Sequence, residues 1–405
     1  MIRGEGTSTV GILGAGAMGA GIAQVAAAAG WRVRLFDVDV DTAQHAIDGI
    51  GARLEKRVAR GRMTADDAAA LVERLSVGDE LSQLNDCELF IEAIVEDMDI
   101  KVQALQGVLK HLPSDAIIAT NTSSLSVSDL GEGVDQPERT CGMHFFNPAP
   151  VMKLVEVVAG RSTSPAVADR VEAIALHWGK QVARCADTPG FIVNRVARPY
   201  YLEAFRCLED GLCTPDLLDA AMRDAGGFRM GPFELTDLIG HDVNAATTRS
   251  VWTSWNEPAR LSPVYAQEAL VAAGDLGRKS GCGVYDHSGE TPIAVLRPGQ
   301  DAPALTKALT TVATDFAARA SDTAGDLPAP LQVALMRVLC GLFNEALWSH
   351  ADGVADETAI DTAMRFGVNY PRGPFEWMAG IGSDTLDATF TVLANDVDAG
   401  RYLRP

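Results

Sequence analysis

A glycine-rich turn near the N-terminus constrains the fold of this chain more than any other feature. Residues 8–13 form a short run of β-branched and apolar side chains, and Gly14-Ala15-Gly16-Ala17-Met18-Gly19 follows at once. Residues 20–29 are small and apolar, as in a helix packed closely on a sheet, and residues 32–36 resemble a second strand that ends at Asp37. This order of strand, glycine turn, helix, strand and acid predicts a βαβ unit at the start of a parallel sheet.

The residues of the turn indicate a dinucleotide site. Gly14 permits the tight turn, Gly16 lets a pyrophosphate approach the backbone at the helix N-terminus, and Gly19 lets the helix lie close to the strand; Met18 belongs to the same motif. Asp37, 21 residues after Gly16, is placed to accept hydrogen bonds from a ribose 2′-hydroxyl and would repel a 2′-phosphate. The motif therefore favours NAD over NADP. The alternative is a glycine turn that binds nothing.

The charge balance limits the partners that the chain can have. It carries 34 Lys and Arg against 54 Asp and Glu, a net charge of −20, which argues against non-specific binding of nucleic acid. Any anionic ligand must then meet a local basic patch. One basic cluster exists, and its first four members share a helix face: Arg53, Lys56, Arg57, Arg60 and Arg62. The alternative is a solvated charged face.

The sequence also bears on location. We find no apolar run of the ~20 residues that a membrane span needs; the longest candidate, 20–29, contains Gln24, and residues 1–6 lack the apolar core of a secretory signal. The seven cysteines are scattered without a Cys-x-x-Cys pair, and the seven histidines show no metal-ligand spacing. We therefore expect a cytoplasmic protein with reduced thiols, no membrane partner and no metal site.

Further along, the pattern alternates and then becomes helical. Strands are expected at 87–93, 116–120, 140–146 and 153–158, with a helix at 99–112, so that a parallel, doubly wound sheet is predicted. The β pattern ends at the turn 187–190, and a second break lies at 287–303. We expect a Rossmann-like α/β domain at 1–187, a helical domain at 188–287, and a linker with a second helical domain at 288–405.

The two helical domains are copies of one another. With an offset of 142 residues, 16 of the 46 positions in 195–240 are identical without a gap. Glu203-Ala204 falls on Glu345-Ala346, and the run 231–234 falls on 373–376. Such agreement indicates a tandem duplication.

Four further segments carry a family resemblance: residues 92–96, 121–125, 144–148 and 187–195. Together with the glycine turn they resemble the 3-hydroxyacyl-CoA dehydrogenase family over residues 8 to about 286, and the duplicated end resembles its longer bacterial members. Residues 178–181 and 195–201 resemble the 3-hydroxyadipyl-CoA type of aromatic-acid catabolism; the related 3-hydroxybutyryl-CoA dehydrogenases share the same pattern.

The residues and the resemblance agree on a catalytic pair. His144 lies at an expected strand end, where loops of such sheets carry ligands, and Glu156 lies in a strand that can return beside it and fix the imidazole tautomer. The resemblance gives the same two residues these roles, and it assigns substrate oxygens to Ser123 and Asn194. We expect Ser124 and Ser126 to cap the following helix instead.

The resemblance also implies the residues that line the binding sites. For the cofactor these are Glu96, Lys101, Asn147 and Lys279. For the CoA phosphates it implies contacts on the basic helix, among them Arg53, Lys56 and Arg60.

The expected activity is NAD-dependent oxidation of (3S)-3-hydroxyacyl-CoA to 3-oxoacyl-CoA in fatty-acid β-oxidation or aromatic-acid (phenylacetate) catabolism. The alternatives are a dehydrogenase of a free hydroxy or sugar acid and a non-catalytic NAD-binding structural protein. Asn194 falls on Met336 in the second helical copy, so we expect that copy to be structural. It would make the chain a monomer with an internal pseudo-dimer, or else a homodimer.

Overall fold

The computed structural model describes residues 8–300 and 304–405. Two compact units divide the chain, one ending at Phe191 and the other beginning at Ile192. The N-terminal segment 1–6 and the end of the expected break, residues 301–303, lie outside the described residues. Each unit is taken by itself below.

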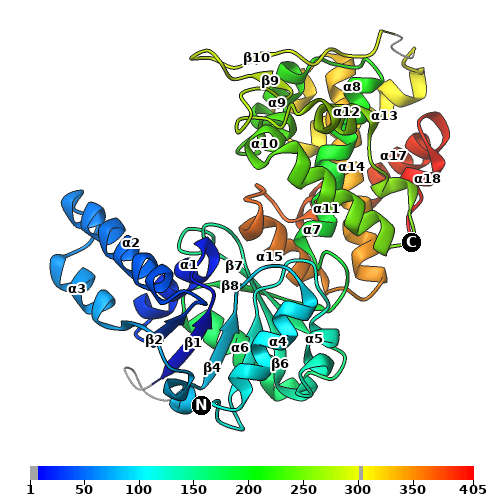
Figure 1. Cartoon of the computed structure of the whole chain (residues 1–405). Helices are drawn as coiled ribbons and strands as arrows, with labels where there is room; N and C mark the ends of the chain where they lie inside the picture. Colours follow the sequence, from blue (N-terminus) through cyan, green and yellow to red (C-terminus); the bar gives the residue numbers. More distant parts are fainter. Residues whose placement is uncertain (1–7, 301–303) are drawn as a thin grey trace. The chain divides into compact units, whose positions relative to one another are not determined.

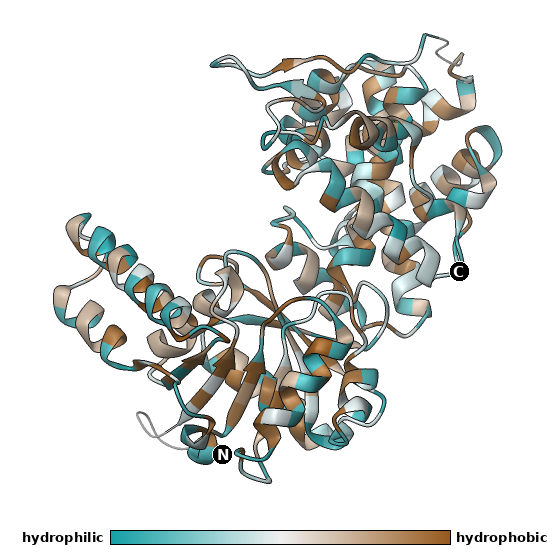
Figure 2. Cartoon of the chain, viewed as in Figure 1, coloured by the Kyte–Doolittle hydropathy of each residue, from teal (hydrophilic) through white to brown (hydrophobic). Residues whose placement is uncertain are grey.

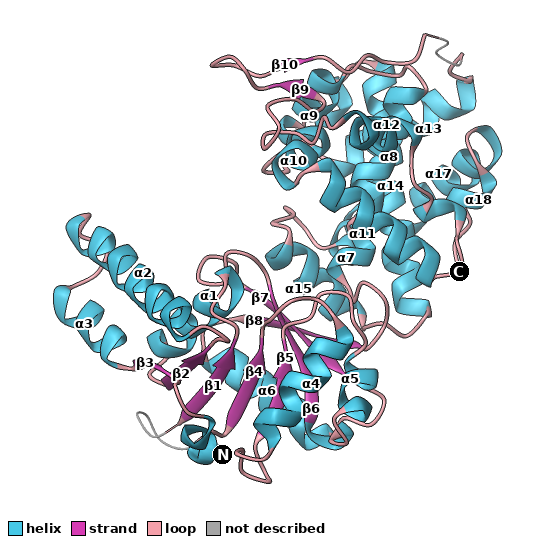
Figure 3. Cartoon of the chain, in the orientation of Figure 1, coloured by secondary structure: helices cyan, strands magenta, loops and turns pink. Residues whose placement is uncertain are grey.

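The first unit is an eight-stranded sheet covered by helices (Figures 1 and 3). Its strand order is β3-β2-β1-β4-β5-β6-β7-β8, and all neighbours are parallel except β6 and β7. This arrangement confirms the predicted Rossmann-like fold. The elements are β1 (Thr9–Leu13), α1 (Ala17–Ala28), β2 (Arg32–Phe36), α2 (Val40–Ala59), α3 (Ala65–Glu73), β3 (Leu75–Val77), β4 (Leu89–Glu92), α4 (Met98–Leu109), β5 (Ile117–Thr120), α5 (Val127–Gly133), β6 (Thr140–Phe145), β7 (Leu154–Ala159), α6 (Pro165–His177) and β8 (Gln181–Ala186).

The central strands of the sheet are buried and mostly apolar, which explains why they were predictable. The residues of β4 and β5 are all buried, and Figure 2 shows the strands in the colours of hydrophobic residues. Parallel strands covered on both faces need such continuous apolar runs. The edge strands β3 and β8 escaped prediction because β3 has three residues and β8 alternates buried and exposed positions around Arg184.

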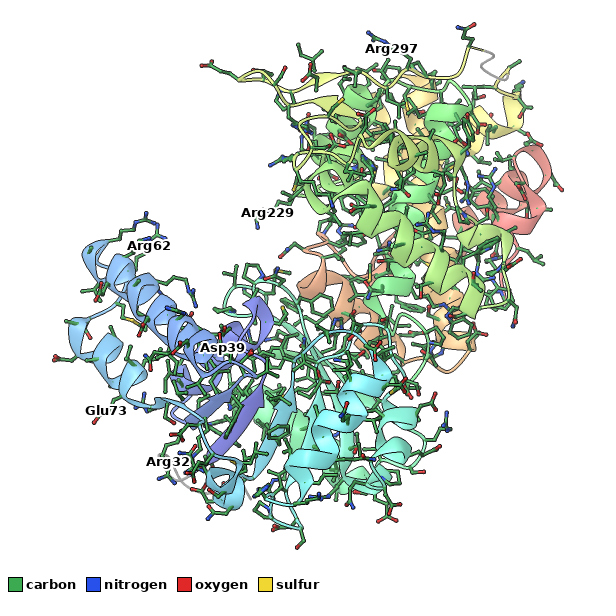
Figure 4. All side chains as sticks on the ribbon, viewed as in Figure 1. Arg32, Asp39, Arg62, Glu73, Arg229 and Arg297 are labelled. Atoms are coloured by element: carbon green, nitrogen blue, oxygen red, sulfur yellow. The ribbon has the colours of Figure 1, made fainter. Side chains whose placement is uncertain are left out.

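Helices α2 and α3 form an arm of the first unit (Figure 1). Asp39 caps α2 by accepting a hydrogen bond from the Asp41 amide, and Thr64 caps α3 in the same way. Asp39 and Arg62 lie toward opposite ends of the arm (Figure 4). The expected basic face is therefore carried on a helix whose buried stripe holds it to the unit.

The second unit is helical apart from one short strand pair, which overlaps the break expected at 287–303. Its elements are α7 (Val193–Val196), α8 (Arg198–Glu209), α9 (Pro215–Asp224), α10 (Pro232–Ile239), α11 (His241–Ser254), α12 (Tyr265–Ala273), β9 (Tyr285–Asp286), β10 (Ile293–Ala294), α13 (Lys307–Ala320), α14 (Ala329–Ala351), α15 (Glu357–Gly367), α16 (Pro374–Ile381), α17 (Ser383–Asp396) and α18 (Ala399–Tyr402). The pair β9–β10 is antiparallel and corrects the expectation that all β structure ends near residue 190.

The duplication is visible in the helices themselves. At the offset of 142, α10 falls on α16 and α11 on α17 with identical bounds. Local bonding repeats as well: Asp219 accepts the amides of Phe233 and Glu234 at 3.0 and 2.9 Å, and Asp361 accepts those of the equivalent residues at 2.8 and 2.9 Å.

The two copies exchange ion pairs. Arg195 binds Glu345 and Asp352 at 2.6 Å each, and its counterpart Arg337 binds Glu203 at 3.3 Å and Asp210 at 2.6 Å. Burial alone would raise the pKa of Glu203, but the surrounding guanidinium groups lower it to about 2. Reciprocal contacts of this kind define a two-fold interface, here formed inside one chain.

One described helix, α14, is long and apolar enough to cross a membrane by length and composition, and 89% of its apolar window is buried inside the protein. The sequence analysis overlooked it because Arg337 and Glu345 interrupt its apolar residues. Helix α14 packs against α8 and α13 as the central helix of the second unit.

Candidate active site

The glycine turn has the geometry that a dinucleotide needs. Gly14 has a positive φ of 103°, and a Cβ on Gly19 would lie 1.7 Å from the Gly14 carbonyl oxygen, so that only glycine fits there. Beside Gly16, by contrast, no atom lies within 4 Å of the Cβ position. Open space at this point of the turn fits a pyrophosphate drawn close to the backbone at the start of α1.

A cavity of about 710 Å³ extends from the turn. It is lined by Gly14, Gly16, Met18 and Asp37 and by apolar side chains of the α4 region, including Ile94 and Ile100. Asp37 Oδ2 accepts a hydrogen bond from the Ala15 amide at 2.7 Å, so the carboxylate is held at the mouth of the turn. Four of the expected dinucleotide residues, Gly14, Gly16, Met18 and Asp37, therefore share one cavity, whereas Gly19 does not line it.

The expected catalytic pair is in contact. His144 at the end of β6 faces Glu156 of β7 in antiparallel register, and His144 Nδ1 lies 2.7 Å from Glu156 Oε2. Glu156 is fully buried and His144 is 6% exposed. The rings of Phe146 and Phe191 lie 4.6 and 5.7 Å from the imidazole, so that the pair sits in an apolar setting.

Glu96 organises the loop that carries Ser123. Its Oε1 accepts hydrogen bonds from the Thr122 hydroxyl at 2.8 Å and from the amide and hydroxyl of Ser123 at 2.8 and 3.2 Å. Burial would raise the pKa of Glu96, but these bonds and Lys101 lower it. Ser124 also donates to Glu96, at 3.0 Å; the expectation that it caps a helix is wrong, because α5 begins at Val127 and its N-cap position is taken by Ser126.

Two neighbours complete this description. Ser126 is the N-cap of α5, as expected, and accepts from the Asp129 amide. Lys101 is 1% exposed, with its ammonium 2.6 Å from Glu92 and 3.2 Å from Glu96. The structure therefore holds Lys101 in a buried ion pair behind Glu96, and a cofactor contact through it stays a prediction.

A second cavity of about 710 Å³ brings part of the basic cluster next to Asn147. Its lining includes Arg53, Arg57 and Arg62 together with Asn147 and Gln24, which accepts from Arg53 at 3.4 Å. Lys56 and Arg60 are exposed on α2 and at its end, and they do not line this cavity. Of the three basic residues expected to bind CoA, Arg53 alone faces the cavity.

Two expected site residues belong to the helical unit. Asn194 lies in α7, partly exposed. Lys279 forms an ion pair with Asp242 of α11, and this pairing lowers the pKa of Asp242.

Sequence reasoning missed two residues beside the catalytic pair. Asn121 belongs to the segment 121–125. Its side-chain oxygen accepts a hydrogen bond from the Phe145 amide at 2.9 Å and so fixes the end of β6. Lys180 is 6% exposed and donates to the carbonyls of Ala149 and Met152 at 2.5 and 2.8 Å. A lysine before a strand carries no signal for such a role, since most lysines are exposed.

Comparison with known proteins identifies the family to which the chain belongs. A sequence model of the 3-hydroxyacyl-CoA dehydrogenase NAD binding domain matches residues 9–188, and a model of the C-terminal domain matches residues 190–287 and 334–405. The chain belongs to the 3-hydroxyacyl-CoA dehydrogenase family. It is thus an NAD-dependent oxidoreductase, as the sequence analysis expected.

Individual relatives agree with this assignment. The chain is 41% identical to 3-hydroxyadipyl-CoA dehydrogenase of Escherichia coli (strain K12), over 92% of this chain and 91% of that one. It is 36% identical to a probable 3-hydroxybutyryl-CoA dehydrogenase of Bacillus subtilis (strain 168), over 69% and 97%. A crystal structure of 3-hydroxybutyryl-CoA dehydrogenase from Escherichia coli K12 superposes with a TM-score of 0.86 at 38% identity, covering 98% and 97%.

Proposed function

We propose that this dehydrogenase oxidises the hydroxyl group of (3S)-3-hydroxyacyl-CoA thioesters with a short acyl group, by means of His144 as general base. The observation that carries the proposal is the buried contact of 2.7 Å between His144 Nδ1 and Glu156 Oε2. A carboxylate accepts, so Nδ1–H donates, and this leaves Nε2 to take the hydroxyl proton.

The remaining residues assist this step. Glu156, buried beneath the imidazole, stabilises the imidazolium that forms. Glu96 holds the amide of Ser123, and the Ser123 hydroxyl exchanges its contact with Glu96 for a hydrogen bond donated to a substrate oxygen. Asn194 donates to a second substrate oxygen, and together they keep the reacting carbon in place. When bound, NAD supplies the hydride acceptor, with Gly14, Gly16, Met18, Gly19 and Asp37 as its contacts. The proposed cofactor site also includes Glu96, Lys101, Asn147 and Lys279.

The CoA part of the substrate fits the second cavity. Arg53, Arg57 and Arg62 bring positive charge to a cavity lined also by Asn147, in a chain with a net charge of −20. Phosphates need such a local concentration of guanidinium groups. Lys56 and Arg60, on the exposed side of the arm, add attraction at longer range.

The proposal extends to the organisation and location of the chain. In this proposal residues 1–187 form a dinucleotide domain, residues 188–287 form a helical domain that carries Asn194, and residues 288–405 form a linker and a structural copy. One chain therefore holds one active site. All seven cysteines are free thiols, which favours the reducing cytoplasm. The names of the relatives point to 3-hydroxyadipyl-CoA and 3-hydroxybutyryl-CoA as substrates, and hence to aromatic-acid or fatty-acid catabolism.

One assay separates this function from its alternatives. NADH oxidation is followed by absorbance with acetoacetyl-CoA and, in parallel, with free acetoacetate. The proposed enzyme turns over the thioester and leaves the free acid almost untouched. Equal turnover of both would identify a dehydrogenase of free acids, and NADH binding without turnover of either would identify a non-catalytic protein.

A further inference from the structure

Among the buried hydrogen-bond donors of the helical unit that have no acceptor, three belong to Arg198, Asn244 and Tyr370. Arg198, the first residue of α8, is 5% exposed, and its Nε has no partner. Asn244 Nδ2 and Tyr370 Oη, on residues that are 2% and 6% exposed, also have none. Within residues 8–300 and 304–405, no carboxylate pairs with Arg198, whose one hydrogen bond runs from Nη1 to the Asn244 carbonyl at 3.3 Å.

Arg198 lies near Tyr370 and beside the backbone of Asn244. Nη1 of Arg198 donates a hydrogen bond to the Asn244 carbonyl, and the guanidinium lies 5.1 Å from the ring centre of Tyr201. The charges of Arg198 and Tyr370 each shift the pKa of the other group. Burial lowers the pKa of Arg198 and raises that of Tyr370. A guanidinium without a counter-charge and two further donors without acceptors are unfavourable inside a protein, because burial removes their hydration and no hydrogen bond replaces it.

The duplicated copy shows that packing does not require these groups. At the offset of 142, Arg198 corresponds to Cys340, Asn244 to Leu386 and Tyr370 to Phe228. These counterparts are 0%, 7% and 5% exposed, so each position is equally buried and is filled by an apolar side chain. The same helical arrangement therefore forms without the polar groups, so that packing alone does not explain them.

We propose that Arg198, with Asn244 and Tyr370, binds the distal carboxylate of a dicarboxylic 3-hydroxyacyl-CoA. This inference rests on the proposed function, in which Asn194 holds oxygens near the reacting end. A planar guanidinium matches a carboxylate in two parallel hydrogen bonds, and the hydroxyl of Tyr370 and the amide of Asn244 supply donors for its remaining lone pairs.

The spacing along the helix suits a six-carbon diacid. Arg198 comes four residues after Asn194, and the backbone stays helical through Ala197, so the two positions are about 6 Å apart along the axis. The distal carboxyl carbon of such an acyl group lies three carbon–carbon bonds of about 1.5 Å beyond C3, which is roughly 4 Å. The arginine side chain spans the difference between this length and the separation of the two helix positions. Tyr370 would then give the second helical copy a share in the substrate site.

The test compares two thioesters of equal length. We measure kcat/KM for 3-hydroxyadipyl-CoA and for 3-hydroxyhexanoyl-CoA, in which a methyl group replaces the carboxylate. The ratio of the first value to the second is compared between the parent and Arg198→Met. The parent favours the diacid, and Arg198→Met lowers the ratio by about tenfold to a hundredfold, since it removes a charge-assisted pair.

Further variants separate a role in binding from a role in folding. Tyr370→Phe and Asn244→Leu install the side chains of the other copy, and each is expected to lower the ratio several-fold. Thermal stability should stay equal or rise in Tyr370→Phe, whereas Asn244→Leu also removes the acceptor of the buried Gln267 amide and should lower it. Arg206→Met is the matched control: Arg206 lies on the same helix, is 8% exposed, and has its guanidinium bonded to Glu203 and Ser262. It should lower the melting temperature and leave the ratio unchanged.

The results separate a failure of the proposed function from a failure of the inference about Arg198. A parent that turns over neither thioester overturns the proposed function and this inference with it. A parent that turns over both, with a ratio that Arg198→Met and Tyr370→Phe do not change, leaves the proposed function standing and overturns the inference; the three donors then bind buried water only.

Discussion

His144 and Glu156 meet because of strand register. They are twelve residues apart, and the antiparallel turn from β6 to β7 sets them opposite one another. The same pairing would fail with a shift of one residue, since alternate side chains point to opposite faces of a sheet. The catalytic geometry therefore depends on the connection between these two strands as much as on the pair itself.

We expect Asp37 to set the cofactor preference. Its carboxylate lines the dinucleotide cavity and is held by the Ala15 amide, and the neighbouring Val38 is fully exposed. We predict that Asp37→Ser with Val38→Arg shifts the preference from NADH toward NADPH by at least tenfold in kcat/KM, because a repelling charge is replaced by a guanidinium.

The control is Val38→Arg alone, which keeps the carboxylate and should shift the preference much less. If the double variant discriminates between NADH and NADPH as the parent does, Asp37 does not lie at the ribose.

Single residues also show what the sequence could not predict. The catalytic pair, the glycine turn and Ser126 follow from local motifs that carry their own geometry. The contact of Ser124 does not, because its partner is Glu96, 28 positions away in the chain. Long-range hydrogen bonds of this kind are decided by tertiary packing, which local pattern does not encode.

At the scale of elements, the loop between β6 and β7 is held by one buried lysine. Lys180 donates to the carbonyls of Ala149 and Met152, and burial lowers its pKa to about 8. We predict that Lys180→Met lowers the free energy of unfolding at pH 7 by about 1–3 kcal/mol, because two carbonyls lose their donor.

The same lysine predicts a pH dependence. Its pKa is 10.5 in the unfolded reference and about 8 in the fold, so between these values the unfolded chain binds a proton that the folded chain lacks. Stability from this group therefore rises with pH in this range. Urea unfolding should show the parent gaining stability over Lys180→Met between about pH 8 and pH 10.5, and a difference independent of pH would contradict the account.

Lys153→Met is the matched control, because Lys153 lies in the same loop and is exposed. It should change neither the stability at pH 7 nor its dependence on pH.

Elements differ in how far the sequence determines them. The central strands were predictable because two covered faces demand continuous apolar residues, and β2 has the predicted bounds. Strands β3 and β8 at the edges, and the pair β9–β10, are short or alternating and depend on neighbours for their hydrogen bonds. The helical repeat was predictable from identity at a fixed offset, but the exchange of ion pairs between the copies was not.

At the scale of the whole molecule, the two helical copies form one cooperative unit. The reciprocal pairs of Arg195 and Arg337 are buried, and removing one partner of a buried pair is strongly destabilising. We predict that deletion of the chain from about residue 290 exposes the apolar face that α14 covers and causes dimerisation or aggregation, as measured by size-exclusion chromatography.

The second copy should not add a second active site. Met336, the counterpart of Asn194, is fully buried, and Met336→Leu should leave kcat almost unchanged. A truncated chain that stays monomeric, soluble and as heat-stable as the parent would contradict this organisation, as would two equivalents of NAD bound per chain in calorimetry.

The central claim is that His144, oriented by Glu156, takes the substrate proton while other residues hold the cofactor. It is tested most directly by measuring NADH affinity and turnover of acetoacetyl-CoA in His144→Gln. General base catalysis contributes about 10²–10⁴-fold, so the account predicts that kcat falls by at least this factor while the Kd for NADH stays within about twofold of the parent value. A parallel loss of NADH binding and turnover, or turnover close to that of the parent, would contradict it.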